Sequence, residues 1–143
     1  MKHKFLKSVA GLAMFASAFA FAQTPYPTKP ITMIVPFAAG GPTDTVARLV
    51  AQSMTNTLKQ TVLVENVGGA GGTIGAARVA KSAPDGYTLF LHHIGQSTAP
   101  SLYRKLSYNA VDDFEPIGLI TDVPMTFIAR GDFPAKDLSL IHI

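Results

Sequence analysis

The sequence predicts an α/β fold built on a parallel β-sheet. Short apolar segments alternate with segments of helical periodicity, and glycine-rich corners follow the first two apolar segments. Each corner leads directly into a helical pattern, which is the βαβ alternation of a parallel sheet. The 143 residues suit about one domain, and 48% hydrophobic with 15% charged residues is a globular composition.

Residues 1–22 have the pattern of a secretory signal peptide. Three lysines precede an uncharged apolar run, and Ala20 and Ala22 form the small-x-small pattern that signal peptidases cleave. The apolar run at 9–22 is shorter than the roughly 20 residues that span a bilayer, so no stable membrane anchor is expected after cleavage. Cleavage before Gln23 predicts a periplasmic mature chain.

The net charge of the chain comes from this leader. The chain has 12 Lys and Arg against 9 Asp and Glu, and three of the basic residues but no acidic one lie within 1–22. The remainder is neutral and shows no basic stripe, so no nucleic-acid partner is expected. Because there is no cysteine, disulfides, thiolate nucleophiles and Cys metal sites are excluded.

The first predicted unit follows a Pro-rich tether at 23–30. The segment 31–37 (ITMIVPF) is a short apolar run typical of a buried strand, and a helix is expected from the corner to about residue 59. Thr43 or Asp44 can cap this helix. Its buried face is predicted from apolar residues spaced three or four apart, namely Val46, Leu49, Val50, Met54 and Leu58.

The unit then recurs. A second strand at 61–66 leads through the corner VGGAGG into a helix at 73–83, and a third strand is expected at 87–93 after a PDG turn. A short helix is expected within 96–106, and one or two further strands within 114–130.

Both glycine corners follow the carboxyl ends of strands, where parallel sheets form their ligand crevice. Each leads into a helix N-terminus, whose free N–H groups and dipole favour an anion, and glycine allows a ligand to approach the backbone. Since no Lys or Arg cluster is present, a small carboxylate fits better than a large polyanion. Tight turns without a ligand are the alternative interpretation. A dinucleotide loop is disfavoured because Ile74 stands where G-x-G-x-x-G requires its third glycine.

Catalytic and metal-ligating groups are sparse, so neither a cofactor nor a metal is expected. His92 and His93 are adjacent on a predicted strand and are expected to point to opposite faces, so they do not form a chelating pair. One is expected to face the core and the other to face solvent or lie at the strand end. Asp112, Asp113 and Glu115 are interpreted as a solvated turn rather than a metal cluster. No nucleophile lies beside a recognisable base.

Three blocks carry a family resemblance: ITMIVPFAAGGPTDTVARLVA, VLVENVGGAGGTIGAARVAKSAPDGYTL and SLYRKLSYNAVDDFEPIGLI. Together they resemble, over about 26–137, the substrate-binding proteins of tripartite tricarboxylate transporters, the Bug or TctC-like family. The resemblance implies a type II periplasmic-binding-protein fold, in which two α/β lobes close on a small organic acid and deliver it to membrane transporter subunits. It implies a non-catalytic receptor that is monomeric when full length.

By position, the resemblance implies that the two corners hold one carboxylate through backbone groups and bridging waters. The residues concerned are, in the first corner, Phe37, Ala38, Gly40, Gly41 and Asp44, and in the second, Gly69, Ala70, Gly71 and Gly72. The segment from His92 to Ser97 is expected to face the cleft between the lobes. Two departures stand out: Val67-Gly68 replaces the usual Arg- or Lys-Pro pair, and PFAAGG replaces the commoner PFPPGG.

Receptors of this family are much longer than this chain. Residues 31–138 are therefore interpreted as part of the N-terminal lobe, with the second lobe largely missing and 139–143 as a non-native tail. Two other functions stay open from the sequence: an exported α/β enzyme acting on a carboxylate, and a sensor subunit that presents its ligand to a membrane kinase. The sequence does not identify the carboxylate.

Overall fold

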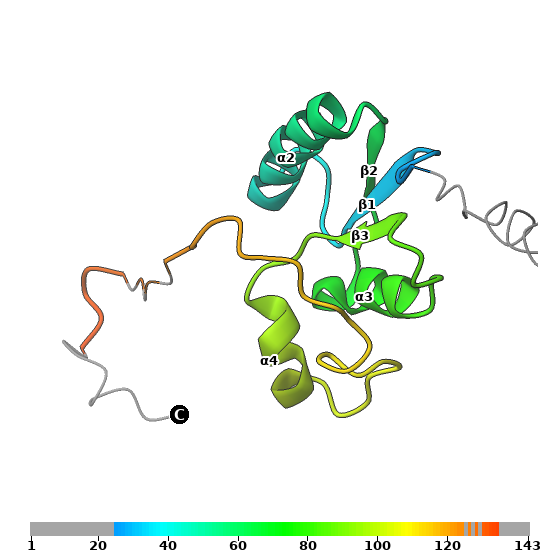
Figure 1. Ribbon diagram of the computed structural model, residues 1–143. Helices are drawn as coiled ribbons and strands as arrows, with labels where there is room; N and C mark the ends of the chain where they lie inside the picture. Colours follow the sequence, from blue (N-terminus) through cyan, green and yellow to red (C-terminus); the bar gives the residue numbers. More distant parts are fainter. Residues whose placement is uncertain (1–24, 125, 127, 129, 135–143) are drawn as a thin grey trace, which may run out of the picture.

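A three-stranded parallel β-sheet organises the part of the chain that the structure, a computed structural model, describes: residues 25–134 apart from 125, 127 and 129. The strands are β1 (Ile31–Val35), β2 (Val62–Asn66) and β3 (Thr88–Phe90), in the order β2-β1-β3. The helices are α2 (Pro42–Leu58), the 3₁₀ turn η2 (Ala70–Gly72), α3 (Thr73–Ala80) and α4 (Gly95–Leu102). This arrangement confirms the predicted α/β class (Figure 1).

The central strand β1 carries the core. It pairs with β2 from Ile31↔Val62 to Val35↔Asn66 and with β3 from Thr32↔Thr88 to Ile34↔Phe90. Helices cover both faces of the sheet, so β1 is buried on both sides and has the near-continuous apolar sequence of such strands. Its buried members are Ile31, Met33, Ile34 and Val35.

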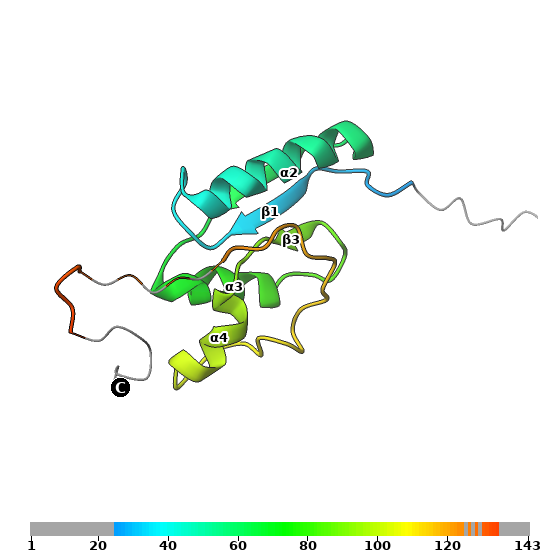
Figure 2. The same cartoon turned by 90° about the vertical axis from the view of Figure 1, so that its left-hand side faces the viewer.

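The helices lie in two layers. Helix α2 covers one face of the sheet, while α3 and α4 lie on the other (Figures 1 and 2). The connection from β1 to β2 and the connection from β2 to β3 run in opposite directions across the sheet, and right-handed crossovers then place their helices on opposite faces. As a result, the chain leaves β1 and β3 toward different faces, which is the arrangement at whose carboxyl ends open α/β sheets bind ligands.

Helix α2 agrees with the prediction in extent but differs in its cap. The N-cap residue is Gly41, without a side-chain cap hydrogen bond, and Pro42 occupies the first turn. The prediction of Thr43 or Asp44 as the cap was wrong, because the Asp44 carboxylate turns back to the N–H group of Gly40. Proline suits this position since its missing N–H would have no intrahelical acceptor there.

The buried stripe of α2 also differs from the prediction. Ala47 and Ala51 are buried against the sheet, whereas Leu49 is 64% exposed and was wrongly assigned to the core. The two alanines bring the helix close to the sheet, and Leu49 lies off the stripe that they define. The other predicted residues hold partly buried positions: Val46, Val50, Met54 and Leu58.

The remaining elements are present with shorter bounds. Helix α3 ends at Ala80 rather than 83, β3 is three residues long, and α4 lies close to the range expected for the short helix. The strands expected within 114–130 are not formed by the described residues of that range. Ile117 and Leu119 are 84% and 82% exposed, and no described strand pairs with this segment.

Candidate functional site

The two glycine corners lie side by side at the carboxyl edge of the sheet because β1 and β2 are neighbours. The Val67 N–H donates to the Val35 carbonyl at 2.8 Å, which continues the ladder into the corners. A Cβ added at Gly68 would lie within 4 Å of Phe37 and Ala38. All nine predicted site residues lie in the loop after β1, in the first turn of α2, or in the loop and η2 after β2.

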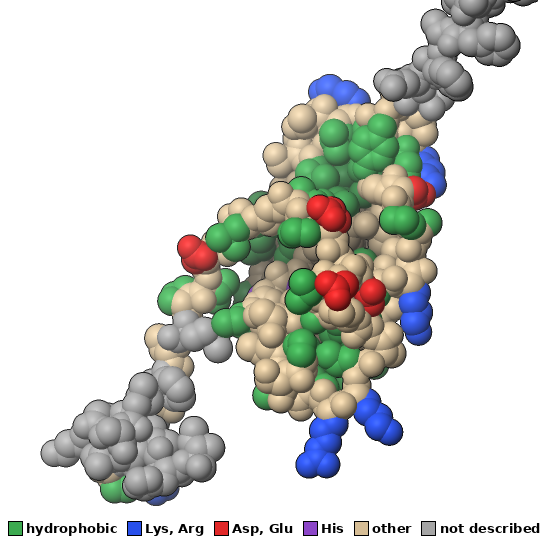
Figure 3. Space-filling view, turned by 60° about the horizontal axis from the view of Figure 1, so that its bottom comes forward, with side chains coloured by type: hydrophobic (Ala, Val, Ile, Leu, Met, Phe, Trp, Pro, Cys, Tyr) green, Lys and Arg blue, Asp and Glu red, His purple; other side chains and the backbone are tan. Residues whose placement is uncertain are grey.

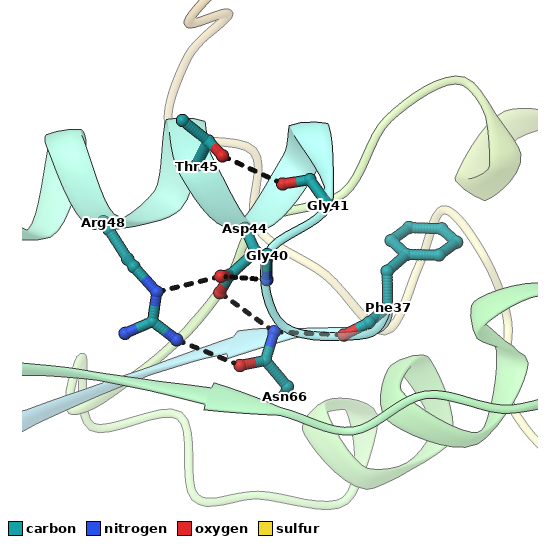
Figure 4. A network of polar contacts seen from close by, with 7 residues as sticks. All are labelled: Phe37, Gly40, Gly41, Asp44, Thr45, Arg48 and Asn66. Atoms are coloured by element: carbon teal, nitrogen blue, oxygen red, sulfur yellow. Dashed lines mark hydrogen bonds and ion pairs between the residues drawn. The ribbon is translucent and has the colours of Figure 1, made fainter.

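Asp44 is the buried charge of this edge. It is 2% exposed, and its carboxylate accepts the Gly40 N–H at 2.8 Å and the Arg48 Nε at 2.9 Å (Figure 4). Asn66 adds a third donor at 3.0 Å. The hydrogen bond from Arg48, followed by those from Gly40 and Asn66, lowers the pKa of Asp44 to about 2. The carboxylate is therefore ionised and fully engaged, which favours a role in shaping the corner over a direct contact with an anion.

Asn66 joins the two corners. Its Nδ2 donates to the Phe37 carbonyl at 3.0 Å as well as to Asp44, and its Oδ1 accepts Arg48 Nη2 at 3.3 Å (Figure 4). The last residue of β2 therefore fixes the loop after β1. Sequence reasoning missed both Asn66 and Arg48. The spacing of Asp44 and Arg48, four apart on one helix, is a recognisable ion-pair signal, whereas the contact with Asn66 is long-range.

In the first corner, the N–H groups of the two glycines already donate to acceptors within the protein and are not free for a ligand. Gly40 N–H is taken by Asp44, and Gly41 N–H donates to the Ala38 carbonyl at 3.4 Å. Within the described residues, the N–H groups of Ala38, Ala39 and Thr43 have no protein acceptor. The N–H groups of Phe37 and Asp44 also have no protein acceptor there, and together these groups are the donors that the first corner can present to an anion.

The second corner has an unusual backbone. Gly69, Gly71 and Gly72 have φ angles of 124°, 63° and 95°, in a region that favours glycine, and Ala70 joins them at 45°. Gly72 N–H donates to the Gly69 carbonyl at 2.9 Å. In the described part of the chain, the N–H groups of Gly69, Ala70 and Gly71 have no protein acceptor, so this corner also presents free donors.

An aromatic cluster lies after the carboxyl ends of β1 and β3. The Phe37 ring stacks on His93 with centroids 4.4 Å apart and meets the edge of His92 at 5.3 Å. His92 is half-buried and His93 is exposed, but the two rings lie against each other with centroids 5.0 Å apart and both contact Phe37. The prediction that they point to opposite faces of a strand was therefore wrong, because β3 ends at Phe90 and strand alternation does not extend to these residues. Burial, with a smaller contribution from His93, lowers the pKa of His92 to about 4, so this imidazole is neutral at physiological pH.

The acidic segment after α4 forms a turn, as predicted. The Asn109 backbone N–H and side-chain amide donate to Asp113 and Asp112 at 2.7 and 2.6 Å, and these carboxylates and Glu115 are exposed. No group of three side chains suited to a metal ion occurs among the residues that the structure describes.

A shallow, open depression borders the first corner. It lies along the start of α2 and contains no residue of the second corner; its lining residues are Ala39, Gly40, Asp44, Thr45, Arg48, Leu49 and Gln52. Arg48 faces this depression, but two of its guanidinium nitrogens are engaged with Asp44 and Asn66. The depression therefore overlaps the first corner but does not reach the second one.

Solved structures that share this architecture are periplasmic binding proteins. BugD superposes with a TM-score of 0.68 at 61% identity, covering 80% of this chain and 38% of BugD. MatC from Rhodopseudomonas palustris, solved with bound malate, has a TM-score of 0.61 at 50% identity, covering 64% of this chain and 31% of MatC. Another R. palustris protein, solved with adipate, has a TM-score of 0.57 at 37% identity, with coverage of 59% and 29%. The chain has the α/β fold of this class.

A family model described as the tripartite tricarboxylate transporter family receptor, TctC, matches residues 46–141. The chain belongs to this family. A UPF0065 protein from the TAR-I ttuE-ttuC' intergenic region of Agrobacterium vitis is 61% identical over 115 residues, covering 80% of this chain and 33% of the relative. BugT of Bordetella pertussis is 42% identical over 139 residues, with coverage of 94% and 40%. The chain thus spans less than half the length of these curated relatives.

Proposed function

We propose that the chain captures a small organic carboxylate and belongs to the N-terminal lobe of a periplasmic receptor for a tripartite tricarboxylate transporter. The observation that carries this proposal is the pair of adjoining corners with unengaged N–H groups at the carboxyl edge of β1 and β2. Two relatives with similar folds were solved with dicarboxylates, malate and adipate.

The chemistry of the edge favours a carboxylate. Backbone N–H groups at the start of a helix provide hydrogen bonds and a positive dipole end without a net charge. Arg48, the cation nearest to the first corner, already pairs with Asp44 at 2.9 Å. In this proposal Ala38 and Ala39 donate from the first corner, with Thr43 beside them, and the backbone of Gly69 to Gly71 donates from the second. The first corner takes its shape from Gly40, Gly41 and Asp44. In the second corner, the absence of a side chain at Gly72 leaves room for the rings of His92 and Phe37. Phe37 covers the side of the corners that faces β3.

The proposed receptor is exported and works with membrane partners. Residues 1–22 act as its signal peptide, residues 31–138 belong to the lobe, and the transporter subunits receive the ligand from a monomeric receptor without catalysis. No helix among the described residues is long and apolar enough to cross a membrane. Mass spectrometry of the exported protein should give an amino terminus at Gln23, and retention of Met1 would contradict the periplasmic location.

Binding can be tested by NMR on the exported, ¹⁵N-labelled chain. Titration with malate and with adipate should shift the amide signals of Ala38, Ala39 and Thr43, together with those of Gly69, Ala70 and Gly71. The corresponding diamides, which carry no charge, serve as matched control ligands and should leave these signals in place. Shifts confined to Thr45, Arg48, Leu49 and Gln52 along α2, or no shift at either corner, would contradict the proposal.

A further inference from the structure

Two side-chain groups lie against the second corner in addition to its free backbone N–H groups. We infer that the His92 Nε2–H and the Tyr103 hydroxyl are ligand-binding donors that add side-chain selectivity to this corner. The inference rests on the proposed function and deepens it by naming residues that select among carboxylates.

The hydrogen bonding of His92 fixes its tautomer. Its Nδ1 accepts the backbone N–H of His93 at 2.7 Å, so in the neutral imidazole the proton resides on Nε2. The low pKa of this ring, caused mainly by burial, keeps it neutral at pH 7. Within the described residues Nε2 has no hydrogen-bond partner, and it is therefore an unengaged donor.

This donor points at the second corner. A Cβ added at Gly72 would lie 2.9 Å from His92 Nε2 and 3.4 Å from the Phe37 ring. The absence of a side chain at Gly72 is what allows the imidazole to approach. Contacts with Phe37 and Phe90, with ring centroids 5.3 and 5.2 Å away, hold the imidazole in place.

Tyr103 meets the same backbone one residue earlier. It follows α4 directly and is half-buried, and a Cβ added at Gly71 would collide with its hydroxyl oxygen. No acceptor or donor for this hydroxyl occurs in the described part of the chain. Since consecutive Cα atoms are about 3.8 Å apart, the hydroxyl and the imidazole Nε2 converge on one short stretch of backbone.

Together these groups form a mixed donor set. Free N–H groups at Gly69, Ala70 and Gly71 lie beside two neutral side-chain donors, and none of them adds a positive charge. Such a set recognises an anionic oxygen by hydrogen-bond direction, which discriminates between carboxylate orientations better than a diffuse cation does. The structure thus assigns selectivity to residues outside the glycine corners themselves.

The test compares malate affinities of matched variants of the exported chain, measured from the corner amide shifts. Tyr103→Phe removes only the hydroxyl and should weaken binding about tenfold or more, the loss typical of a hydrogen bond to a charged group. Tyr26→Phe is the matched control, because Tyr26 bonds Gly86 at the opposite end of the sheet. His92→Asn should weaken binding, while His92→Gln, whose amide nitrogen can replace Nε2, should restore much of it.

Each outcome has a defined meaning. Weakening by Tyr103→Phe and His92→Asn with an unaffected Tyr26→Phe supports the inference. Wild-type affinity in the first two variants, with the corner amides still shifting, overturns it and leaves the proposed function standing. No corner shift in the wild-type chain overturns both. Independently of any variant, an imidazole ¹⁵N spectrum with the His92 proton on Nδ1 would also overturn the inference.

Discussion

Asn66 is the residue on which the alignment of the two corners depends. Its amide bonds the Phe37 carbonyl, Asp44 and Arg48, and so joins the end of β2 to the loop after β1. The sequence could not reveal this role, because an Asn at a strand end is a common turn residue and its partners lie 22 and 29 positions away. The corners themselves were predictable because their signal, glycine between a strand and a helix, is local.

We expect Asn66→Ala to lower the free energy of unfolding by about 1–3 kcal/mol, because it leaves partly buried acceptors without a donor. The same change should weaken malate binding, since the corners lose their common anchor. Urea unfolding followed by circular dichroism measures the first effect. Asn56→Ala, on the exposed side of α2, is the matched control and should change stability by less than about 0.5 kcal/mol. Equal effects of the two substitutions would show that Asn66 is not an anchor.

His92 predicts a particular dependence of stability on pH. Its folded pKa of about 4 lies below the ordinary value of 6.5, so the unfolded chain binds the proton more readily. The neutral His92 ring therefore makes its full contribution to the free energy of unfolding above about pH 6.5. This contribution is lost as the pH falls from 6.5 through 4. Asp44, whose folded pKa is about 2 rather than 3.8, loses its stabilisation only at lower pH, as the pH falls from 3.8 through 2.

Urea midpoints measured between pH 7 and pH 4 should fall for the wild-type chain and fall less for His92→Phe, which keeps the aromatic packing. His93→Gln removes only the smaller contribution to this pKa and leaves the burial of His92, so it should retain most of the wild-type slope. An unchanged slope in His92→Phe would contradict the assignment of this pH dependence to His92.

At the scale of elements, the sequence predicted the order and type of β1, α2, β2, α3, β3 and α4, because apolar runs and glycine corners report on the local chain. The predicted buried face of α2 was wrong at Leu49, because the prediction counted only large apolar residues and left out Ala47 and Ala51. Close packing of a helix on a sheet selects alanine at the contact, which an apolar pattern does not distinguish from a loosely packed position. An apolar run such as those within 114–130 forms a strand only where another strand pairs with it, and local sequence does not report such pairing.

This packing gives a paired prediction for α2. Ala47→Leu should destabilise the fold by about 1–3 kcal/mol, because Ala47 is fully buried between α2 and the sheet and has no room for a larger side chain. Leu49→Lys should change stability by no more than about 0.5 kcal/mol, since Leu49 is exposed. Thermal unfolding of both variants checks this. If Leu49→Lys strongly lowered the stability of the fold and Ala47→Leu did not, the buried face of α2 would be the one predicted from periodicity.

At the scale of the whole molecule, the described chain presents apolar side chains to solvent beyond α4. Figure 3 shows one face on which apolar side chains are exposed between polar and acidic ones. Several of the most exposed apolar residues belong to the segment that was predicted as strands, namely Ile117, Leu119, Val123 and Ile128. An extended apolar segment of this kind is typical of a surface that packs against further protein.

If the corners form one side of a two-lobe site, this chain should bind malate weakly, with a dissociation constant in the millimolar range or above. A closing receptor gains affinity by burying its ligand between two lobes and expelling water, and one set of corners supplies only part of those contacts. Calorimetry on the exported chain, with analytical ultracentrifugation of the same sample, measures affinity and association together. Micromolar binding by a stable monomer would show that these corners are a self-sufficient site, and the two-lobe interpretation would then be wrong.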